Sequence, residues 1–238
     1  MHRVMKIIYK KFDKQLISLL PRVLFPGQII VVDDPQQVDE AVDFLLKQEI
    51  LGVDTETRPS FQKGVRYEVS LLQVSTDDVC YLFRLNHVGM APGILRLLTD
   101  TTVPKIGLSW HDDLAMLYRR QDFVPGLFID IQDVSKKFGI VDTSLQKLFA
   151  NIFHLKISKG QRLSNWEASQ LKEGQQLYAA TDAWACILLY RAFQEMNESG
   201  DYELVEPIAE PTHEESQQTD VVVSIDRKES VDNNQEAL

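Results

Sequence analysis

The sequence has 238 residues, of which 44% are hydrophobic and 25% charged, as in ordinary soluble globular proteins. Its two cysteines, Cys80 and Cys186, stand far apart and outside any CxxC or Cys/His cluster. This excludes a disulfide scaffold and a structural zinc site, and it favours a reducing compartment. No apolar run approaches the roughly 18 residues of a membrane span, so we expect no membrane association and a cytoplasmic location.

Charge is distributed unevenly along the chain. The net charge is −10, from 25 Lys and Arg against 35 Asp and Glu. Residues 1–25 carry six basic residues and one acid, whereas residues 201–238 carry two basic residues and eleven acids. Because divalent cations can bridge carboxylates and phosphates, the acidic balance does not exclude nucleic acid as a partner.

Residues 1–27 have the pattern of a basic amphipathic helix, with apolar side chains near helical spacing and lysines largely on other faces. Two roles stay open for it: an extra helix packed on the domain, or an arm that grips phosphate groups. The apolar stretch before Pro21 is too short for a secretion signal, while an organellar presequence remains an alternative. The apolar residues concerned are Met5, Ile8, Tyr9, Phe12, Leu16 and Leu19.

Residues 28–198 alternate between strand and helix patterns, which predicts one α/β domain with a mixed β-sheet and helices on both of its faces. The polar, acidic composition of residues 199–238 predicts a disordered tail. The chain has no GxxxxGK[ST] phosphate loop, so we expect no nucleotide cofactor. Strands are expected at 28–32, 51–54, 69–74, 79–85 and 105–108, and helices at 37–47, 92–98, 112–120, 131–138, 145–151 and 173–197.

Two acids, Asp54 and Glu56, stand at the end of the expected strand at 51–54. Period-two alternation places both carboxylates on one face of an extended chain. A hard divalent cation prefers such oxygen ligands, although Asp-x-Glu also occurs in solvated turns. The motif alone is therefore compatible with either a cation site or a solvated turn.

A second pair, Tyr178 and Asp182, lies four residues apart in an otherwise apolar helical segment. This spacing puts both side chains on one face of the helix. An ionised carboxylate there requires a cation, hydrogen bonds or an opening to solvent.

Between these motifs, Asp112 and Asp113 stand at the start of an expected helix, where acids also act as ordinary N-terminal caps. The pair His111-Asp112 also imitates the metal-binding HD pair of phosphohydrolases. That interpretation needs partner histidines, which the scattered histidines of this sequence do not supply.

The order Asp-x-Glu, Asp, Tyr-x-x-x-Asp resembles the DEDD superfamily of 3'-5' exonucleases, within the DnaQ-like, ribonuclease H-like group. Tyr178, with Leu177 where another subgroup has His, is typical of the tyrosine-containing DEDDy subgroup. The resemblance covers about residues 28–197. The segments 144–148 and 164–166 make it more similar to the Werner-type exonuclease domain than to the ribonuclease D catalytic domain.

The resemblance implies a ribonuclease H-like fold and two divalent cations, Mg²⁺ or Mn²⁺, bound by four carboxylates. Asp54 would bridge the ions, Glu56 and Asp182 would complete the water-activating site, and Asp113 would hold the other ion. Asp113 fits the family better than Asp112, because a hydrophobic residue follows it directly. Tyr178 would orient the attacking water or help deprotonate it.

Basic residues near these motifs are candidates for binding the substrate backbone. Lys159 and Arg162 are the best of them, and Arg58 and Lys63 are weaker. Two nearby tryptophans, Trp166 and Trp184, are expected in the core.

The implied function is removal of single nucleotides from single-stranded or frayed 3' ends, releasing nucleoside 5'-monophosphates, with DNA slightly favoured over RNA. Two alternatives are a catalytically silent nucleic-acid-binding module of the same fold and an RNA-processing exonuclease similar to ribonuclease D. That family's appended helical domains have no counterpart in the short, polar segment after Gly200. The oligomeric state is not indicated by the sequence.

Overall fold

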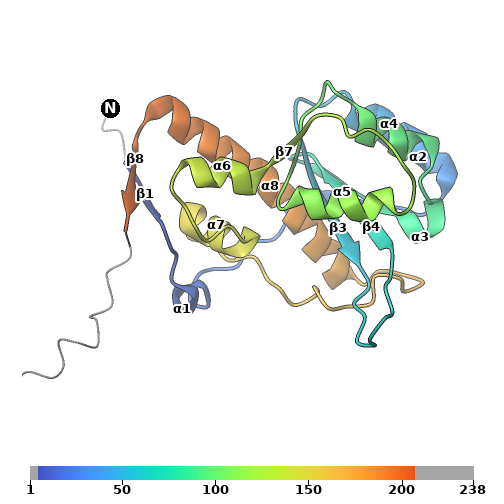
Figure 1. The fold of residues 1–238 in the computed structure, drawn as a ribbon, viewed down its shortest axis with the longest axis horizontal. Coiled ribbons are helices and arrows are strands. Elements are labelled where there is room, and N and C mark those ends of the chain that lie inside the picture. Colours follow the sequence, from blue (N-terminus) through green and yellow to red (C-terminus); the bar gives the residue numbers. More distant parts are fainter. Residues whose placement is uncertain (1–4, 207–238) are drawn as a thin grey trace, which may run out of the picture. The chain divides into compact units, whose positions relative to one another are not determined.

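A computed structural model describes residues 5–206 and places a six-stranded mixed sheet at the centre of the domain (Figure 1). β4 runs antiparallel to both of its neighbours, β3 and β5, whereas the other neighbouring strands are parallel. The predicted mixed sheet is therefore confirmed. In spatial order the strands are β2 (Gln28–Val32), β5 (Val79–Arg84), β4 (Val69–Ser75), β3 (Leu51–Thr57), β6 (Lys105–Gly107) and β7 (Phe128–Asp130).

Helices cover both faces of this sheet, because alternate strand residues are apolar on both sides. In β4, Leu72 and Val74 belong to the core under α2, α4 and α5, while Leu71 belongs to the core under α8. α6 and α7 contact α8 and extend this second side. The helices are α2 (Pro35–Leu45), α3 (Leu85–Val88), α4 (Pro92–Thr99), α5 (Trp110–Tyr118), α6 (Ile131–Lys137), α7 (Leu145–Phe153) and α8 (Glu173–Ser199).

α8 is the longest helix of residues 5–206, with 27 residues, and it crosses the sheet and continues past α6 and α7 to β8 (Figure 1). It contacts five neighbouring strands, from β2 to β6 in spatial order, and β3 most extensively. Neither α8 nor any other helix within residues 5–206 has an apolar stretch sufficient to span a bilayer.

The predicted elements of the central domain are confirmed, with ends that differ by a few residues. β3 continues to Thr57, three residues beyond its predicted end, so both acids of the first motif lie within the strand. Its pairing with β4 is irregular between Glu56 and Thr57, where the strand leaves the sheet. Two short elements, α3 and β7, were not predicted.

The predicted N-terminal helix is wrong within the described residues. Residues 6–9 form a strand, β1 (Lys6–Tyr9), and the only helical part of residues 5–27 is the four-residue α1 (Lys14–Ile17). Asn151 of α7 holds the backbone of Tyr9 on both sides, accepting from its N–H (2.9 Å) and donating to its carbonyl (2.7 Å). These pairings, with Ile8 fully buried, outweigh the helical periodicity.

The boundary of the predicted acidic tail is also wrong. Residues 202–205 form β8 (Tyr202–Val205), which pairs in parallel with β1, and Gly200 ends α8 in a left-handed conformation with φ 68°. The rest of the predicted disordered segment, residues 207–238, lies outside the described residues. The chain ends of the domain are thus joined by a two-stranded sheet.

Candidate active site

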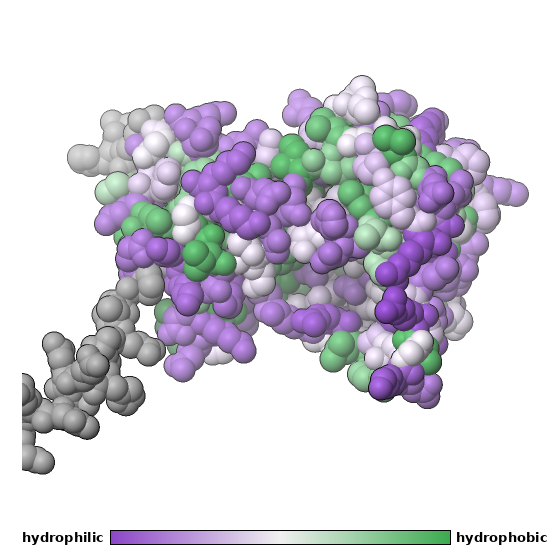
Figure 2. Space-filling model, viewed as in Figure 1, coloured by the Kyte–Doolittle hydropathy of each residue, from purple (hydrophilic) through white to green (hydrophobic). Residues whose placement is uncertain are grey.

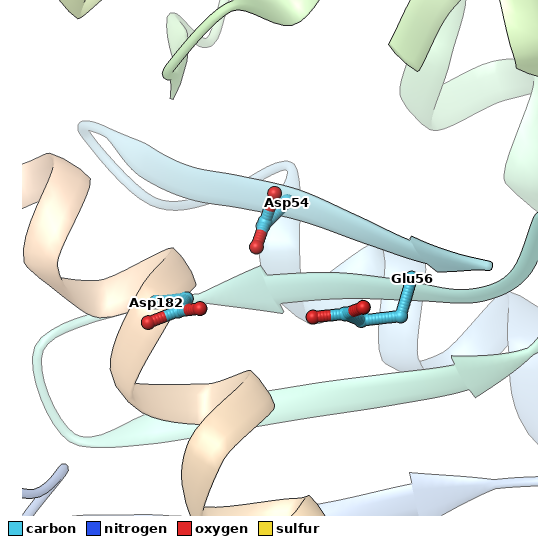
Figure 3. Close-up of side chains that lie close together, drawn as sticks. All are labelled: Asp54, Glu56 and Asp182. Atoms are coloured by element: carbon cyan, nitrogen blue, oxygen red, sulfur yellow. The ribbon is translucent and has the colours of Figure 1, made fainter. Parts of the chain in front are cut away.

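Three carboxylates from distant parts of the chain converge beside the central sheet. Asp54 and Glu56 come from β3 and Asp182 comes from α8, and Figure 3 shows the three side chains turned toward one another. One carboxylate oxygen of each lies within 4.8 Å of the others. Glu56 and Asp182 are buried and Asp54 is partly buried. The two motifs that the sequence places in different elements therefore form one acidic cluster.

A glycine in β3 makes this convergence possible. A Cβ atom at Gly52 would collide with the carbonyl oxygen of Ala183 in α8 and press on Ile187. The strand and the helix therefore approach each other more closely than any other residue at this position allows. Since Gly52 and Ala183 are close neighbours of Asp54 and Asp182 in sequence, this contact sets the spacing of the acids.

The fourth predicted ligand, Asp113, lies next to the cluster but outside the group of three. Its carboxylate accepts a short hydrogen bond from the hydroxyl of Thr55, which lies between the two acids of β3. The neighbouring Asp112 points to solvent, with 87% of its side chain exposed. The geometry therefore favours Asp113 over Asp112, and neither Asp112 nor His111 belongs to the three-acid group.

The start of α5, which carries Asp113, is fixed by Asp130 at the end of β7. The two carboxylate oxygens of Asp130 accept from the backbone N–H groups of Ser109 (3.0 Å) and Trp110 (2.8 Å). Ser109 has a left-handed backbone, with φ 59°, which turns the chain from β6 into the helix. β7 is too short to be predicted from its pattern, so this positioning role of Asp130 was not predicted either.

Burial raises the pKa values of all four carboxyl groups, and the charges of neighbouring acids raise those of Asp54, Glu56 and Asp113 further. Burial is the largest cause in each case, and it raises the pKa of Glu56 to about 9, of Asp182 to about 7 and of Asp113 to about 6. The pKa of Asp54 is also raised well above its ordinary value, by burial and then by the charges of Asp113, Asp182 and Glu56. Asp54 therefore experiences the field of every other acid in the site.

These residues fit divalent cations in both donor type and charge. The donors are carboxylate oxygens, which Mg²⁺ and Mn²⁺ prefer, and no sulfur or imidazole donor joins the three-acid group in the described residues. Clustered buried carboxylates are stabilised in their charged form by cations. Asp54, Glu56 and Asp182, with Asp113 beside them, would therefore hold a divalent cation.

Tyr178 lies one helical turn before Asp182 and shares a side-chain hydrogen bond with it. Its ring packs against the buried Trp166, with ring centroids 6.1 Å apart. The predicted core position of Trp166 is thereby confirmed. Gln175 ties this region to α8, since its amide donates to the hydroxyl of Ser164 (2.9 Å) and the carbonyl of Asn165 (3.2 Å).

The other predicted core tryptophan, Trp184, is partly buried and forms an edge contact with Phe25, at 5.9 Å between ring centroids. It packs in the same core cluster as Tyr178.

Two predicted substrate-binding residues lie within electrostatic reach of the acids. Both Lys159 and Arg162 are exposed on the segment between α7 and α8. The charge of Lys159 lowers the pKa of Asp182, and that of Arg162 lowers the pKa of Glu56. Positive charge therefore borders the acidic cluster on the side of this segment.

The weaker candidates lie on the loop between β3 and β4. Arg58 forms an ion pair with Glu167 (3.1 Å) and lies over the ring of Tyr67, 4.7 Å from its centroid, so it connects this loop to the segment before α8. Lys63 is exposed near the loop tip. The two segments border a pocket of about 320 Å³ lined by Arg58, Pro59, Ser60, Phe61, Gln62, Tyr67, Leu163 and Asn165.

Comparison with known proteins identifies the family. A family model described as a 3'-5' exonuclease matches residues 29–198, which include all four acids and Tyr178. The chain belongs to this 3'-5' exonuclease family and is an enzyme of that class, which confirms the resemblance drawn from the three motifs. The catalytically silent alternative is therefore not supported.

Relatives with curated names agree with this class. The chain is 31% identical over 192 residues to a mouse protein named bifunctional 3'-5' exonuclease/ATP-dependent helicase WRN, covering 76% of this chain and 14% of that protein. It is 30% identical over 213 residues to an Arabidopsis thaliana 3'-5' exonuclease, covering 79% of this chain and 72% of the relative. Identity to ribonuclease D of Haemophilus influenzae is 26% over 187 residues, 77% of this chain and 46% of the relative.

Solved structures show the same fold. The Nibbler EXO domain of Aedes aegypti superimposes with a TM-score of 0.65 at 20% identity, over 74% of this chain and 91% of that domain. Escherichia coli RNase D gives a TM-score of 0.64 at 18% identity, over 73% of this chain and 45% of that protein. The predicted ribonuclease H-like architecture is confirmed.

Proposed function

We propose that the chain removes nucleotides one at a time from 3' ends, releasing nucleoside 5'-monophosphates with the help of two divalent cations. The observation that carries this proposal is the convergence of Asp54, Glu56 and Asp182 within 4.8 Å, with Asp113 beside them. Together these acids supply the charge and oxygen donors for two ions. When bound, Mg²⁺ or Mn²⁺ lowers the pKa of the attacking water and neutralises charge on the phosphate and the leaving 3' oxygen.

Tyr178 acts as a hydrogen-bond donor in this proposal. Burial, followed by the charges of Asp182 and Glu56, raises the pKa of its phenol far above the neutral range. The hydroxyl therefore keeps its proton and orients the attacking water. Of the two roles expected from the sequence, this supports orientation over deprotonation.

The basic residues bordering the acids are proposed to bind the phosphate backbone of the substrate. Lys159 and Arg162 already influence the acids across the site, so a phosphate between them and the cluster is attracted from both sides once cations are bound. Arg58 has a smaller part, because Glu167 already occupies its guanidinium. Lys63 would contact more distant parts of a strand.

DNA is the proposed substrate, with single-stranded or frayed 3' ends preferred. The support is the greater identity to the exonuclease–helicase protein than to ribonuclease D, 31% against 26%. A solved ribonuclease D from Trypanosoma brucei is described in complex with RNA U12. RNA is therefore the alternative substrate to DNA.

The test uses matched 5'-labelled strands of DNA and RNA, single-stranded and in recessed duplexes, with Mg²⁺, Mn²⁺ or chelator. We expect a ladder of strands shortened from the 3' end, dependent on the metal and faster on DNA. Faster shortening of RNA would contradict the substrate assignment. Shortening of neither polymer by the wild-type chain would contradict the proposed activity.

A further inference from the structure

A basic pocket lies on the side of the domain where the N-terminal segment packs, in addition to the pocket beside the β3–β4 loop. Its volume is about 290 Å³. Four of the residues that line it are lysines and none is acidic, although the whole chain carries a net charge of −10. Its charged and apolar lining consists of Lys14, Lys147, Lys156, Lys159, Ile17 and Ile157.

The pocket is assembled from three segments that are far apart in sequence. Lys14 comes from α1, Lys147 from the first turn of α7, and Lys156 and Lys159 from the segment that follows α7. Figure 1 shows α1 beneath α7, and Figure 2 shows hydrophilic residues gathered over this part of the same face. The short N-terminal segment is therefore one wall of the pocket.

Backbone contacts hold that wall in place. The N–H of Lys156 donates to the carbonyl of Pro21 (2.9 Å), and the N–H of Val23 donates to the carbonyl of Lys156 (3.1 Å). The ammonium group of Lys156 also donates to the carbonyl of Ser18 (2.6 Å). The pocket thus has a fixed shape, with an apolar floor beneath its charged groups.

Three of the four lysines have ammonium donors available for an anion. Lys147 is paired with Asp142 (2.8 Å), whereas Lys156 donates only one of its three ammonium N–H groups, to the carbonyl of Ser18. Within residues 5–206, the side chains of Lys14 and Lys159 make neither a hydrogen bond nor an ion pair. Lys159 also connects the pocket to the active site, because its charge lowers the pKa of Asp182. Lys159 is therefore part of both the pocket lining and the positive charge beside the acidic cluster.

We propose that the four-lysine pocket binds the phosphate backbone of the substrate strand several nucleotides upstream of the scissile bond. This inference rests on the proposed exonuclease function. An enzyme that removes one nucleotide at a time has a single nucleotide beyond the scissile bond, so every additional phosphate lies on the upstream side. The pocket makes the N-terminal segment a substrate-binding element, and it favours long strands over very short ones.

The test compares a three-nucleotide strand with a twelve-nucleotide strand of the same 3' sequence, using the full chain and Mn²⁺. In the short strand both phosphodiester groups lie close to the acids, whereas the long strand reaches the pocket. The variant is Lys14→Gln with Lys156→Gln, and the matched control is Lys47→Gln with Lys137→Gln, which removes two exposed lysines outside the pocket.

We expect the ratio of kcat/KM between the long and the short strand to fall about tenfold in the pocket variant and to stay unchanged in the control. The salt dependence of long-strand binding should become shallower by about 1.4 in log K against log salt, because two phosphate contacts are lost. An unchanged ratio, or an equal loss on both strands, would overturn the inference. Inactivity of the wild-type chain on both strands would instead contradict the proposed function.

Discussion

Asp54→Asn should stabilise the metal-free protein while removing most of its response to metal. The substitution keeps the size of the side chain and removes the charge that the other three acids repel. The oxygens of Asp54, Glu56 and Asp182 lie within 4.8 Å of one another, and at that distance two unit charges repel by about 3.5 kcal/mol for an effective dielectric near 20.

Protonation relieves much of this repulsion, because the pKa values of the acids are raised. We therefore expect Asp54→Asn to add about 1–2 kcal/mol to the free energy of unfolding in chelator, which raises the melting midpoint by about 2–8 °C. In the wild-type chain, ions at about 100 times their dissociation constant add about 2.7 kcal/mol and raise the midpoint by several degrees.

Calorimetry of the full chain in chelator and in saturating Mn²⁺ measures both effects. Asp112→Asn is the matched control, since it makes the same chemical change on an exposed neighbour of the site. A melting midpoint of Asp54→Asn below that of the wild type in chelator, or an equal gain of the two proteins from Mn²⁺, would contradict the role of Asp54 as a repelled metal ligand.

Four further predictions concern the surroundings of Asp54. Asp113→Asn should reduce nucleotide release by about 10²-fold or more, since it removes a charged ligand, while Asp112→Asn should keep most activity; the reverse result in a steady-state assay would move the site by one residue. Tyr178→Phe should lower kcat by about 10²-fold with KM nearly unchanged, and an unchanged kcat would make the tyrosine a packing residue. Gly52→Ala should lower both the melting midpoint and activity, because the added methyl collides with α8, and wild-type values for both would contradict the close approach. The metal-free protein should lose stability as pH rises from about 4 to 9, because the folded state binds more protons than the unfolded state where acid pKa values are raised; urea unfolding in chelator that shows a gain instead would contradict those shifts.

Much of the site could be predicted because its chemistry is local in sequence. A spacing of two residues on a strand puts Asp54 and Glu56 on one face of it. A spacing of four residues on a helix does the same for Tyr178 and Asp182. The central strands and helices have apolar patterns that fit their burial, so their order and type were also predicted.

Elements that depend on contacts with distant parts of the chain, or that are very short, could not be predicted from the sequence. β1 has helical periodicity, but β8 and the side chain of Asn151 hold it extended, and both partners lie more than 140 residues away in the sequence. The strand β7 has three residues and leaves too little pattern to detect.

The supporting residues of the site were missed for a related reason. The hydroxyl of Thr55 reaches Asp113 across 58 residues of sequence, and Asp130 reaches the start of α5 across about 20. Gly52 could have been noticed in the sequence, because a glycine inside a strand pattern often marks a close backbone approach, and it stands two residues before Asp54. Its meaning depends on the helix that packs on it, which the sequence does not place.

In the proposed reaction water attacks the phosphorus atom of the last phosphodiester group at the 3' end, and hydrolysis in ¹⁸O-labelled water follows this step. The products of a 5'-labelled DNA strand are analysed by mass spectrometry, with Asp54→Asn as the control for a contaminating nuclease. We expect nucleoside 5'-monophosphates that carry one ¹⁸O in the phosphate, together with shortened strands that end in an unlabelled 3' hydroxyl. Nucleoside 3'-monophosphates, or internal fragments as the first products, would contradict it.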